Sequence, residues 1–426
     1  MAPSPAAPTR ATAARVLVVG AGPAGAALAL LLARRGLPVD LIEATCPGRG
    51  SRPFRGEGLM PSGLAALAAM GLQPLPAAVR QRPLTAWSFF LDGQALFEVA
   101  EPMDSAAPCT LIDQDCLLAE LVEQAGRQPG FRFHRGRAAA DLLLEDGRVA
   151  GVRLADGMAL EAALVVACDG RDSLLRRRGG LTLERAPSPL DVLWFRLEPP
   201  GADAVLDWLA GRFVTVVGAS GSYALFPSAR GGVQLGWAIA PEPPPAPTPA
   251  GPDAWAELWA GDAPEALARR LRDLPAAAVQ GPLRLPVRVG LCPRWQRPGL
   301  LLLGDAAHPM SPLRAQGINM ALRDAVVAAR HLGPVLLEGR PDAIDAAAAA
   351  VAAERRPEIR RIQALQEQEA RRADLLRRRH RLRGLLARTA RWSGPLLARR
   401  WLASQRPLRD GTAAIAGDPG AAAMIG

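Results

Sequence analysis

The sequence predicts an α/β (α+β) fold that opens with a βαβ unit, carries an inserted antiparallel sheet and ends in helices. Near the N-terminus, a glycine turn joins an apolar run to a helical stretch (residues 15–43). Strand-like runs separated by glycine turns occupy residues 191–237. Residues 371–409 combine thirteen arginines with apolar residues at helical spacing. The 426 residues suffice for two domains, or for one large domain with a lobe.

The first element is a turn of the kind that binds dinucleotides. The β-branched run 15–19 leads into Gly20-Ala21-Gly22-Pro23-Ala24-Gly25, then a helix to about Arg35 and a second strand, Val39 to Glu43. Gly20 permits the tight turn, Gly22 lets the backbone approach a pyrophosphate, and Gly25 lets helix and strand pack closely. The helix N-terminus favours phosphate. Glu43 would accept hydrogen bonds from a ribose diol and repel a 2′-phosphate, so this Rossmann-like unit predicts FAD or NAD rather than NADP.

Two further strand ends carry polar motifs. The apolar run 164–167 ends in Cys168-Asp169-Gly170, and the run 300–303 ends in Gly304-Asp305-Ala306-Ala307-His308. A helical pattern begins at Gly317, after a loop that contains Pro312. Its N-terminus would stabilise negative charge on a reduced flavin ring.

Together, these three motifs resemble those of the FAD-dependent aromatic hydroxylases, the class A flavoprotein monooxygenases of the para-hydroxybenzoate hydroxylase fold. The family pattern is GxGxxG, then DG, then GDAAHxxxPxxGQGxN, and the resemblance covers residues 15–370. It implies that Gly20, Gly22, Gly25 and Glu43 hold the ADP half of FAD and that Asp305 binds the pyrophosphate and ribitol side. Pro312, Gly317 and Asn319 would line the isoalloxazine, with Arg55 near the flavin. Ala24, Asp169, Gly304, Gln316 and Ile318, within the same motifs, complete the expected cofactor-binding set.

Some positions depart from the family pattern. Ala315 stands where the first glycine of GQG is usual, which narrows the backbone options at that point. Arg314 adds a positive charge beside the expected flavin. Gln114 stands where the family usually has an arginine, and its amide would still hydrogen-bond FAD. His308 is expected to be structural, and no residue is assigned as catalytic or as a metal ligand.

The resemblance also implies a reaction. NADH or NADPH would reduce FAD, and the reduced flavin would react with O2 to give a C4a-hydroperoxide. That species would hydroxylate an electron-rich carbon of an aromatic or polyketide-like small molecule. No second GxGxxG with flanking strands and no CxxC is present, so the nicotinamide reductant is expected to dock only transiently.

The substrate side is expected in an antiparallel sheet that roofs the flavin. Its strands are predicted at Asp191–Leu197, Val214–Val217, Tyr223–Pro227 and Val233–Trp237, followed by a helix at Trp255–Leu274. The candidates for the pocket lining are Trp194, Arg196, Phe213, Tyr223, Gln234 and Trp237. Because side chains alternate along a strand, about half of them are expected to point away from the pocket.

These patterns divide the chain as follows. Residues 1–14 are expected to form a disordered tail, and 15–180 with 281–370 a discontinuous FAD-binding domain. Residues 181–280 would form the substrate domain, with an exposed proline-rich connection at Pro241–Pro252, and 371–426 a basic helical segment.

Charge is unevenly spread along the chain. The net charge is +10, but residues 371–409 hold thirteen arginines and one acid, so the remainder is slightly acidic. A nucleic-acid footprint over the whole protein is therefore not supported. The basic segment would either pack on its own protein or lie on an anionic membrane surface. Five scattered cysteines without a CxxC pair indicate reduced thiols and a cytoplasmic protein, and no apolar run predicts a transmembrane helix.

Other chemistry on the same fold is weighed against hydroxylation. Flavin-dependent halogenases of this fold rely on a lysine, and this chain has none. A reductase similar to geranylgeranyl reductases, another FAD-dependent oxidoreductase, or a non-catalytic FAD-binding module remains open at this point.

Overall fold

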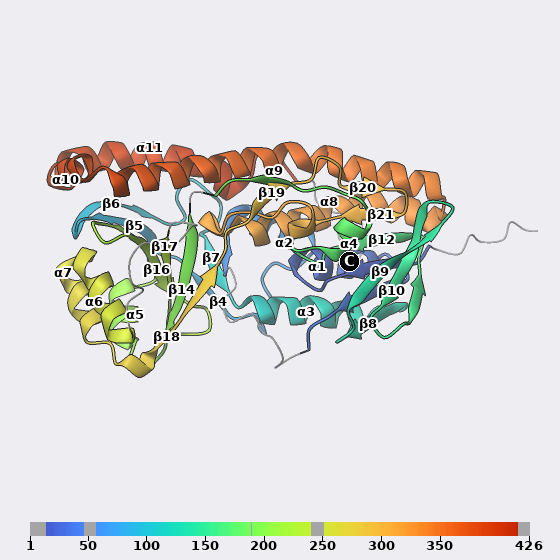
Figure 1. The fold of residues 1–426 in the computed structure, drawn as a ribbon, viewed down its shortest axis with the longest axis horizontal. Coiled ribbons are helices and arrows are strands. Elements are labelled where there is room, and N and C mark those ends of the chain that lie inside the picture. The colour runs from blue at the N-terminus through green and yellow to red at the C-terminus, as the bar shows by residue number, and fades with distance from the viewer. Residues whose placement is uncertain (1–13, 47–56, 189, 240–250, 416–426) are drawn as a thin grey trace, which may run out of the picture.

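The computed structural model describes residues 14–46, 57–188, 190–239 and 251–415. Two lobes follow one another along the long axis of the molecule, and long C-terminal helices run above both (Figure 1). The predicted N-terminal tail (except Ala14), Arg55 and most of the connection Pro241–Pro252 lie outside the described residues. Among the described residues, no helix combines the length and the apolarity needed to cross a membrane.

The first lobe is built on a mostly parallel sheet in the order β20-β21-β12-β1-β2-β8, in which β20 pairs antiparallel at the edge. The strands are β1 (Val16–Val19), β2 (Val39–Glu43), β8 (Phe131–Arg135), β12 (Leu164–Ala167), β20 (Gln296–Arg297) and β21 (Leu300–Leu302). Both faces of a parallel sheet are covered, which explains why every residue of β1, β12 and β21 is buried. The helices that pack around this sheet are α1 (Pro23–Arg34), α3 (Gln114–Gly126) and α8 (Gln316–Glu338).

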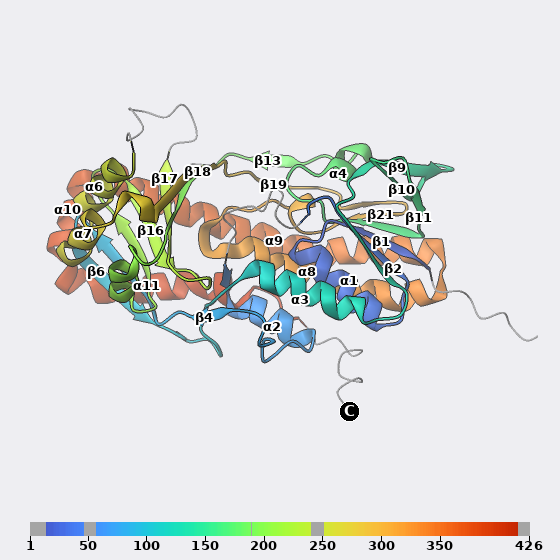
Figure 2. The same cartoon turned by 90° about the horizontal axis from the view of Figure 1, so that it is seen from below.

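Smaller elements complete this lobe. They are β3 (Gly58–Leu59), α2 (Pro61–Ala69), β4 (Gln81–Pro83), β7 (Thr110–Ile112), β9 (Ala139–Glu145), β10 (Arg148–Leu154), β11 (Ala159–Glu161), α4 (Leu174–Arg178), β13 (Glu184–Ala186) and β19 (Val289–Leu291). The view from below shows β13 and β19 running between the two lobes (Figure 2).

The second lobe is a sheet that we call the roof sheet, with strand order β18-β14-β17-β16-β15-β5-β6. Its strands are β5 (Ala86–Leu91), β6 (Gln94–Ala100), β14 (Asp191–Leu197), β15 (Phe213–Val217), β16 (Ser222–Pro227), β17 (Val233–Ile239) and β18 (Val279–Leu285). The strands predicted between 191 and 237 are present. The roof sheet is not confined to residues 181–280, however, because β5 and β6 come from the first hundred residues and β5 pairs parallel with β15.

One face of the roof sheet is covered by α5 (Asp203–Leu209), α6 (Pro252–Asp262) and α7 (Glu265–Arg272). The single helix predicted at Trp255–Leu274 is wrong: the backbone is extended at Ala263 and Pro264, so two helices form there. There, Phe195 packs edge to face against Trp255 and Trp259, which stack on each other. On the other face, α10 and α11 pack against β5 and β6, and the rest of that face borders the site described below.

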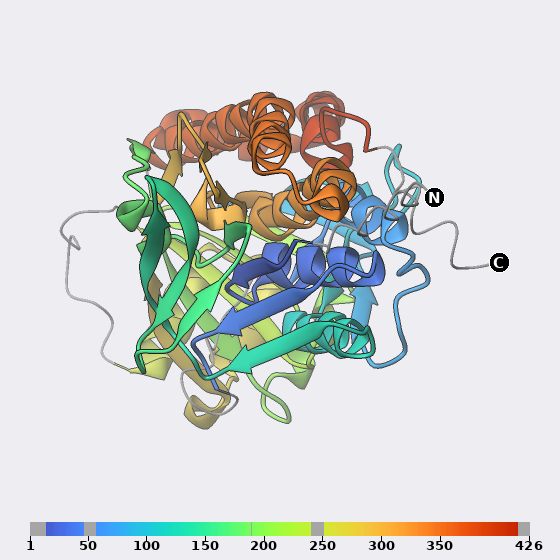
Figure 3. The ribbon, with the colours of Figure 1, turned by 90° about the vertical axis from the view of Figure 1, so that its right-hand side faces the viewer.

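The C-terminal helices are α9 (Pro341–Arg378), α10 (His380–Arg388) and α11 (Ala390–Asp410), and α9 continues through the predicted start of the basic segment at residue 371. Seen end on, the orange and red helices lie side by side above the sheet of the first lobe (Figure 3). Ion pairs fix α10 and α11 to the roof sheet. Arg383 of α10 contacts Asp92 at 2.7 Å, and Arg409 of α11 holds both oxygens of Glu101 at 2.5 and 2.7 Å.

Candidate active site

Three of the predicted motifs lie side by side at the carboxyl edge of the parallel sheet. Since β21, β12, β1 and β2 are neighbours, their ends bring together Gly304-Asp305, Cys168-Asp169, the glycine turn and Glu43. Backbone bonds continue the sheet into these loops: Cys168 donates to Val19 O at 2.7 Å, and Leu303 donates to Ala167 O at 3.0 Å. In open parallel sheets, this edge is where ligands bind.

The glycine turn has the geometry that a pyrophosphate requires. Gly20 has φ +103°, and a Cβ there would lie 2.3 Å from Cys168 O. A Cβ on Gly25 would lie 1.9 Å from Gly20 O, so helix α1 packs directly on the turn. At Gly22, in contrast, a Cβ would meet nothing within 4 Å, and the residue borders a cavity. The open space at Gly22 therefore faces the N-terminus of α1, which favours an anion.

Glu43 lies at the end of β2 and borders the same cavity. Its Oε2 accepts from Ala21 N at 2.8 Å, and its Oε1 accepts from Thr45 N and Thr45 Oγ1 at 2.8 and 2.6 Å. These bonds fix the carboxylate beside the glycine turn, and an ionised carboxylate keeps further lone pairs for a diol.

The other two motifs are linked by an ion pair across the site. Asp169 accepts from Ser173 Oγ at 2.5 Å and from Leu175 N at 3.1 Å, so its side chain orders the start of α4. Arg171 Nε donates to Asp305 Oδ2 at 3.0 Å. Asp169, Arg171, Gly304 and Asp305 all border the cavity.

The loop before α8 divides the predicted flavin residues into two groups. Pro312, Gly317 and Ile318 border the cavity. Gln316 does not; its Nε2 donates to Arg314 O at 2.9 Å and to Leu408 O at 2.8 Å. Asn319 is fully buried and also lies outside the lining, where it accepts from Met60 N and donates to Gly58 O and Ala315 O. These two amides hold the loop in place.

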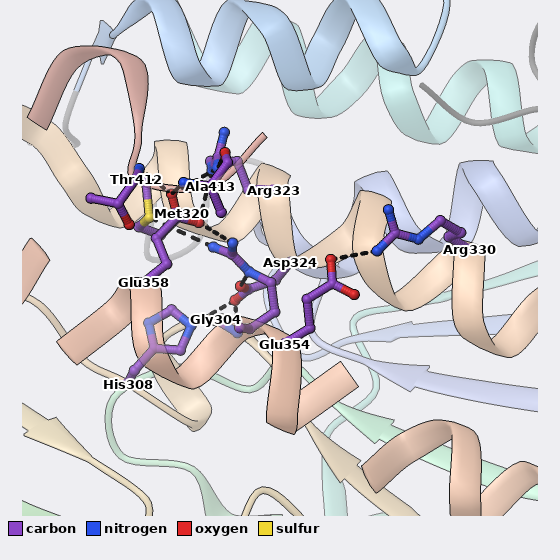
Figure 4. A network of polar contacts seen from close by, with 11 residues as sticks. Gly304, His308, Met320, Arg323, Asp324, Arg330, Glu354, Glu358, Thr412 and Ala413 are labelled. Atoms are coloured by element: carbon purple, nitrogen blue, oxygen red, sulfur yellow. Dashed lines mark hydrogen bonds and ion pairs between the residues drawn. The ribbon is translucent and has the colours of Figure 1, made fainter. Parts of the chain in front are cut away.

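Beneath this loop lies a buried ionic network (Figure 4). His308 Nε2 contacts Asp324 Oδ2 at 2.6 Å, and the same oxygen accepts from Gly304 N at 3.1 Å. Arg355 donates to Asp324 and also to Glu358, which in turn binds Arg323. Burial alone would raise the pKa of Asp324, but His308 and Arg355 outweigh it and hold that pKa below its usual value. His308 thus orients the Gly304 turn from below and does not border the cavity.

The cavity has a volume of about 1780 Å³ and continues from the glycine turn to the face of the roof sheet opposite α5, α6 and α7. Of the candidates for the pocket lining, Trp194 and Phe213 border it, and Trp194 Nε1 donates to Gln234 Oε1 at 2.5 Å. Gln234 and Arg196 lie on the same face as Trp194 but outside the lining, and Arg196 pairs with Glu198 at 2.9 Å.

Tyr223 and Trp237 pack on the opposite face of the roof sheet. They are direct cross-strand neighbours and stack with ring centroids 5.5 Å apart. Although Tyr223 also borders the cavity, its hydroxyl donates to Trp259 O at 2.7 Å, among the helices that cover the sheet. Burial raises the pKa of this phenol far above its usual value. Neither ring faces the cavity as the sequence interpretation proposed.

Sequence reasoning missed most of the aromatic wall, which we call the aromatic chamber. Its missed members are Trp87, Phe89, Phe97, Phe226 and Trp401. Phe213 stacks on Phe226 at 4.9 Å and contacts Trp87 at 4.6 Å, while Trp401 of α11 meets Phe89 at 4.9 Å. The alternating run Trp87-Ser88-Phe89 would have indicated a strand with one aromatic face. Nothing in the sequence placed Trp401 opposite that strand.

Glu57 was missed as well. This residue is buried, borders the cavity, and accepts from Ser228 Oγ, Ala229 N and Gln234 Nε2 at 2.7–2.9 Å. Burial raises the pKa of this carboxyl, and the hydrogen bonds only partly offset that effect. Through Gln234, Glu57 fixes the indole of Trp194.

Gln114 borders the cavity at the first turn of α3. The preceding Asp113 caps this helix by accepting from Asp115 N at 3.1 Å, and it binds Arg80 and Arg230 at 2.5 and 2.7 Å. Burial alone would raise the pKa of Asp113, but the two arginines hold it well below its usual range.

Comparison with known proteins gives matches along most of the chain. The protein family described as FAD binding domain matches residues 13–363. The chain is 36% identical to 6-methylpretetramide 4-monooxygenase of Streptomyces rimosus over 373 residues, covering 84% of this chain and 83% of that protein. It is 30% identical to digeranylgeranylglycerophospholipid reductase 2 of Methanopyrus kandleri, covering 76% of each.

Among solved structures, PqsL of P. aeruginosa in complex with 2-aminobenzoylacetate superposes with a TM-score of 0.73 at 22% identity, covering 87% of this chain and 98% of that one. At this identity, the likeness bears on the fold alone.

Proposed function

Because the chain belongs to the family of FAD-dependent monooxygenases of the aromatic hydroxylase type, we propose that it hydroxylates a polycyclic, polyketide-like aromatic compound with O2 and NADH or NADPH. The polyketide character rests on the 36% identity to a 6-methylpretetramide monooxygenase. The aromatic character agrees with the rings that line the chamber.

The observation that carries this proposal is the continuity of the cavity. Its volume of about 1780 Å³ exceeds the roughly 300–1,000 Å³ of a site for one drug-sized ligand. One end is the glycine turn and the other is the aromatic chamber. A dinucleotide cofactor and a second, large aromatic molecule would therefore share one continuous cavity.

The residues present fit FAD. Gly22 and the N-terminus of α1 would receive the pyrophosphate, and Glu43 would bind the adenosine ribose. Asp305 and Gln114 border the space between the glycine turn and α8, where the ribitol would pass. Pro312, Gly317 and Ile318, at the N-terminus of α8, would line the isoalloxazine.

When bound and reduced by NAD(P)H, FAD supplies the activation of O2 for insertion of one oxygen atom into the substrate. The chain must hold the substrate ring beside the cofactor and exclude water. Trp194, Phe213 and Phe226 provide an apolar wall for that purpose. The chain of hydrogen bonds from Glu57 through Gln234 fixes Trp194, so this wall is held rigidly.

The test uses the purified yellow protein and a panel of hydroxylated anthraquinones and naphthols. We expect these phenols to stimulate NAD(P)H oxidation and ¹⁸O2 to label the product with one atom. Uncoupled hydrogen peroxide is measured in parallel as the control for wasted turnover. If no aromatic compound stimulates oxidation while an isoprenoid alkene is saturated instead, the protein is a reductase and the proposal fails.

We also propose a peripheral contact with anionic membranes at the tip formed by residues 375–396. Of the large apolar side chains that are exposed among the described residues, five lie there: Leu375, Leu382, Leu385, Trp392 and Leu396. Exposed arginines, among them Arg378, Arg381 and Arg388, alternate with them. Apolar side chains within a basic surface fit the interface of an anionic lipid layer. The electrostatic attraction of each arginine to the anionic headgroups contributes about 1 kcal/mol to membrane binding.

This contact is tested by sedimentation of the FAD-loaded protein with phosphatidylserine-containing and phosphatidylcholine vesicles. We expect binding to the anionic vesicles only. It should be lost in Trp392→Glu and retained in Leu144→Glu, which changes another exposed apolar residue far from the tip. Equal sedimentation of wild type and Trp392→Glu excludes the contact. Concentration-dependent dimers in light scattering would assign the tip to a second copy instead.

For the location of the protein, we propose the cytoplasm. None of the five cysteines forms a disulfide, which is the pattern of a reducing compartment. In fractionated cells, we expect the protein in the cytoplasmic fraction, with any membrane-bound part released by salt. Recovery from an oxidising compartment would contradict this.

A further inference from the structure

Two consecutive residues before α8 have a backbone conformation that L-amino acids avoid. Arg314 has φ +58° and ψ 25°, and Ala315 has φ +50° and ψ 31°. A non-glycine residue in this left-handed region is costly and persists only where its surroundings hold it. Such strain gathers at functional sites, which directs attention to the side chain of Arg314.

The guanidinium of Arg314 lies in a cage of three aromatic rings. Its Cζ is 4.8 Å from the centroid of Trp87, 5.1 Å from Trp401 and 5.8 Å from Phe89. The side chain is only 8% exposed and borders the aromatic chamber. Rings of this kind stack on a planar guanidinium and fix its orientation.

One acid completes the cage. Glu369 of α9 accepts from Arg314 Nε at 2.8 Å and also from Nη2. These two bonds occupy one edge of the guanidinium. Among the described residues, Nη1 has no hydrogen-bond partner, so both of its N–H donors remain on an otherwise fixed cation that borders the cavity.

We propose that Arg314 forms an anion subsite of the aromatic chamber and binds an ionised oxygen, a phenolate or enolate, of the aromatic substrate. This inference rests on the proposed hydroxylation and names the ionised form as its substrate class. A buried cation beside a phenol favours the charged form and lowers its pKa. An ionised ring oxygen makes the ring more electron-rich, which is what an electrophilic oxygen transfer requires. Glu369 is the positioning residue, because it fixes the plane of the guanidinium.

A purely structural role is the competing explanation. Arg314 joins the loop before α8 to α9, α11 and β5, so the cage would also serve as a clamp between these elements. The two roles differ in their consequences. A clamp supports the binding of every aromatic ligand equally, whereas an anion subsite discriminates between a ligand with an acidic oxygen and the same ring system without one.

The experiment uses the FAD-loaded protein and two probes: alizarin, a dihydroxyanthraquinone that changes colour on ionisation, and anthraquinone, which has no hydroxyl group. We expect wild type to lower the apparent pKa of bound alizarin by about one unit or more. In Arg314→Gln, this shift should vanish and alizarin should bind about tenfold or more weakly, while anthraquinone binds as before. Arg372→Gln, which removes an exposed arginine at the edge of the same cavity, is the matched control and should behave as wild type.

Three results would overturn the subsite: an unshifted alizarin pKa in wild type, unchanged alizarin binding in Arg314→Gln, or an equal loss of both probes. If Arg314→Gln does not fold, Glu369→Gln decides. Removing the neighbouring negative charge should lower the pKa of bound alizarin further, and a rise would contradict the proposal. Loss of FAD from wild type, or absence of any oxygen transfer, would refute the proposed function and not the subsite, because the probe titration requires no turnover.

Discussion

Replacing Arg409 by methionine tests whether the C-terminal helix is part of the active-site wall. Arg409 and Glu101 are 3% and 1% exposed in their side chains, and the guanidinium binds both carboxylate oxygens. It also donates to Pro102 O at 3.0 Å. In the variant, the carboxylate of Glu101 keeps only the bond from Trp87 Nε1 at 2.6 Å.

The expected loss follows from that burial. Breaking a buried ion pair by removing one partner costs about 3–5 kcal/mol, because the other charge stays buried without compensation. Replacing Glu101 by methionine as well removes that charge. The double variant Arg409→Met/Glu101→Met should therefore recover most of the lost stability. About 1 kcal/mol should remain lost, because Trp87 Nε1 no longer has Glu101 as its acceptor. The control is Arg371→Met, whose partner Glu367 lies on the surface; with side chains 72% and 43% exposed, that pair should contribute less than about 1 kcal/mol.

Urea denaturation followed by tryptophan fluorescence measures these differences, and FAD absorbance measures cofactor retention. Since Trp87 and Trp401 flank the chamber, Arg409→Met should also weaken the binding of an aromatic ligand. FAD retention should change little, because the glycine turn lies in the other lobe. A variant as stable as Arg371→Met would show that α11 is not held by this pair, and the reasoning would fail.

Three further changes probe the cofactor side. Gly22→Val should fold, because a Cβ there meets no protein atom within 4 Å. It should nevertheless lose FAD, because the valine side chain would enter the space for the pyrophosphate. A variant that is still yellow after purification would refute this placement. Asp113→Asn should cost about 1–3 kcal/mol at neutral pH. Because the folded-state pKa of Asp113 is lowered, the stability that its carboxylate contributes is present above its unfolded pKa of about 3.9 and is lost as pH falls toward the folded-state pKa. The urea curves of variant and wild type should therefore converge progressively below about pH 4. A gap that stays constant with pH would contradict this cause. Ala315→Gly should stabilise the fold by up to about 1 kcal/mol in the same assay, because glycine adopts a positive φ at little cost. Ala210→Gly, at φ +48°, is the control and should give a similar gain. A gain only at Ala210 would exclude strain at Ala315.

The cofactor side could be predicted from the sequence because each motif there acts through short-range backbone geometry. Gly20 and Gly25 are required by contacts with residues of the same βαβ unit or of the neighbouring strand end. Glu43 reaches back to Ala21 at 2.8 Å within that unit. The strand order that brings Asp169 and Asp305 alongside follows from the general rule for parallel sheets. Such features leave a signature in consecutive residues.

The aromatic chamber left no comparable signature. The alternation of side chains along β14 to β17 indicated that half of the aromatic residues would point away from the pocket. Which half does so depends on which face of the sheet α5, α6 and α7 cover. Because the helices cover one face, Tyr223 and Trp237 point toward them, and Trp194 points toward the cavity. Trp87 entered the site through a parallel pairing of β5 with β15, across more than a hundred residues of chain. No local pattern specifies a contact at such separation.

The residues that distinguish this loop from the family motif, Arg314 and Ala315, indicate where the substrate chamber meets the cofactor site, which the motif itself does not show. From the sequence alone, Ala315 was expected to narrow the backbone options, and Arg314 was expected to add a positive charge beside the flavin. In the structure, both residues adopt the left-handed conformation that glycine would adopt without cost, and the side chain of Arg314 is held by β5, α9 and α11. Two of these elements, β5 and α11, also supply Trp87, Phe89 and Trp401 of the chamber wall that sequence reasoning missed. Ala315 replaces the motif glycine, and its neighbour Arg314 is held by elements distant in the sequence. This pair therefore connects the predictable cofactor site to the unpredicted substrate site.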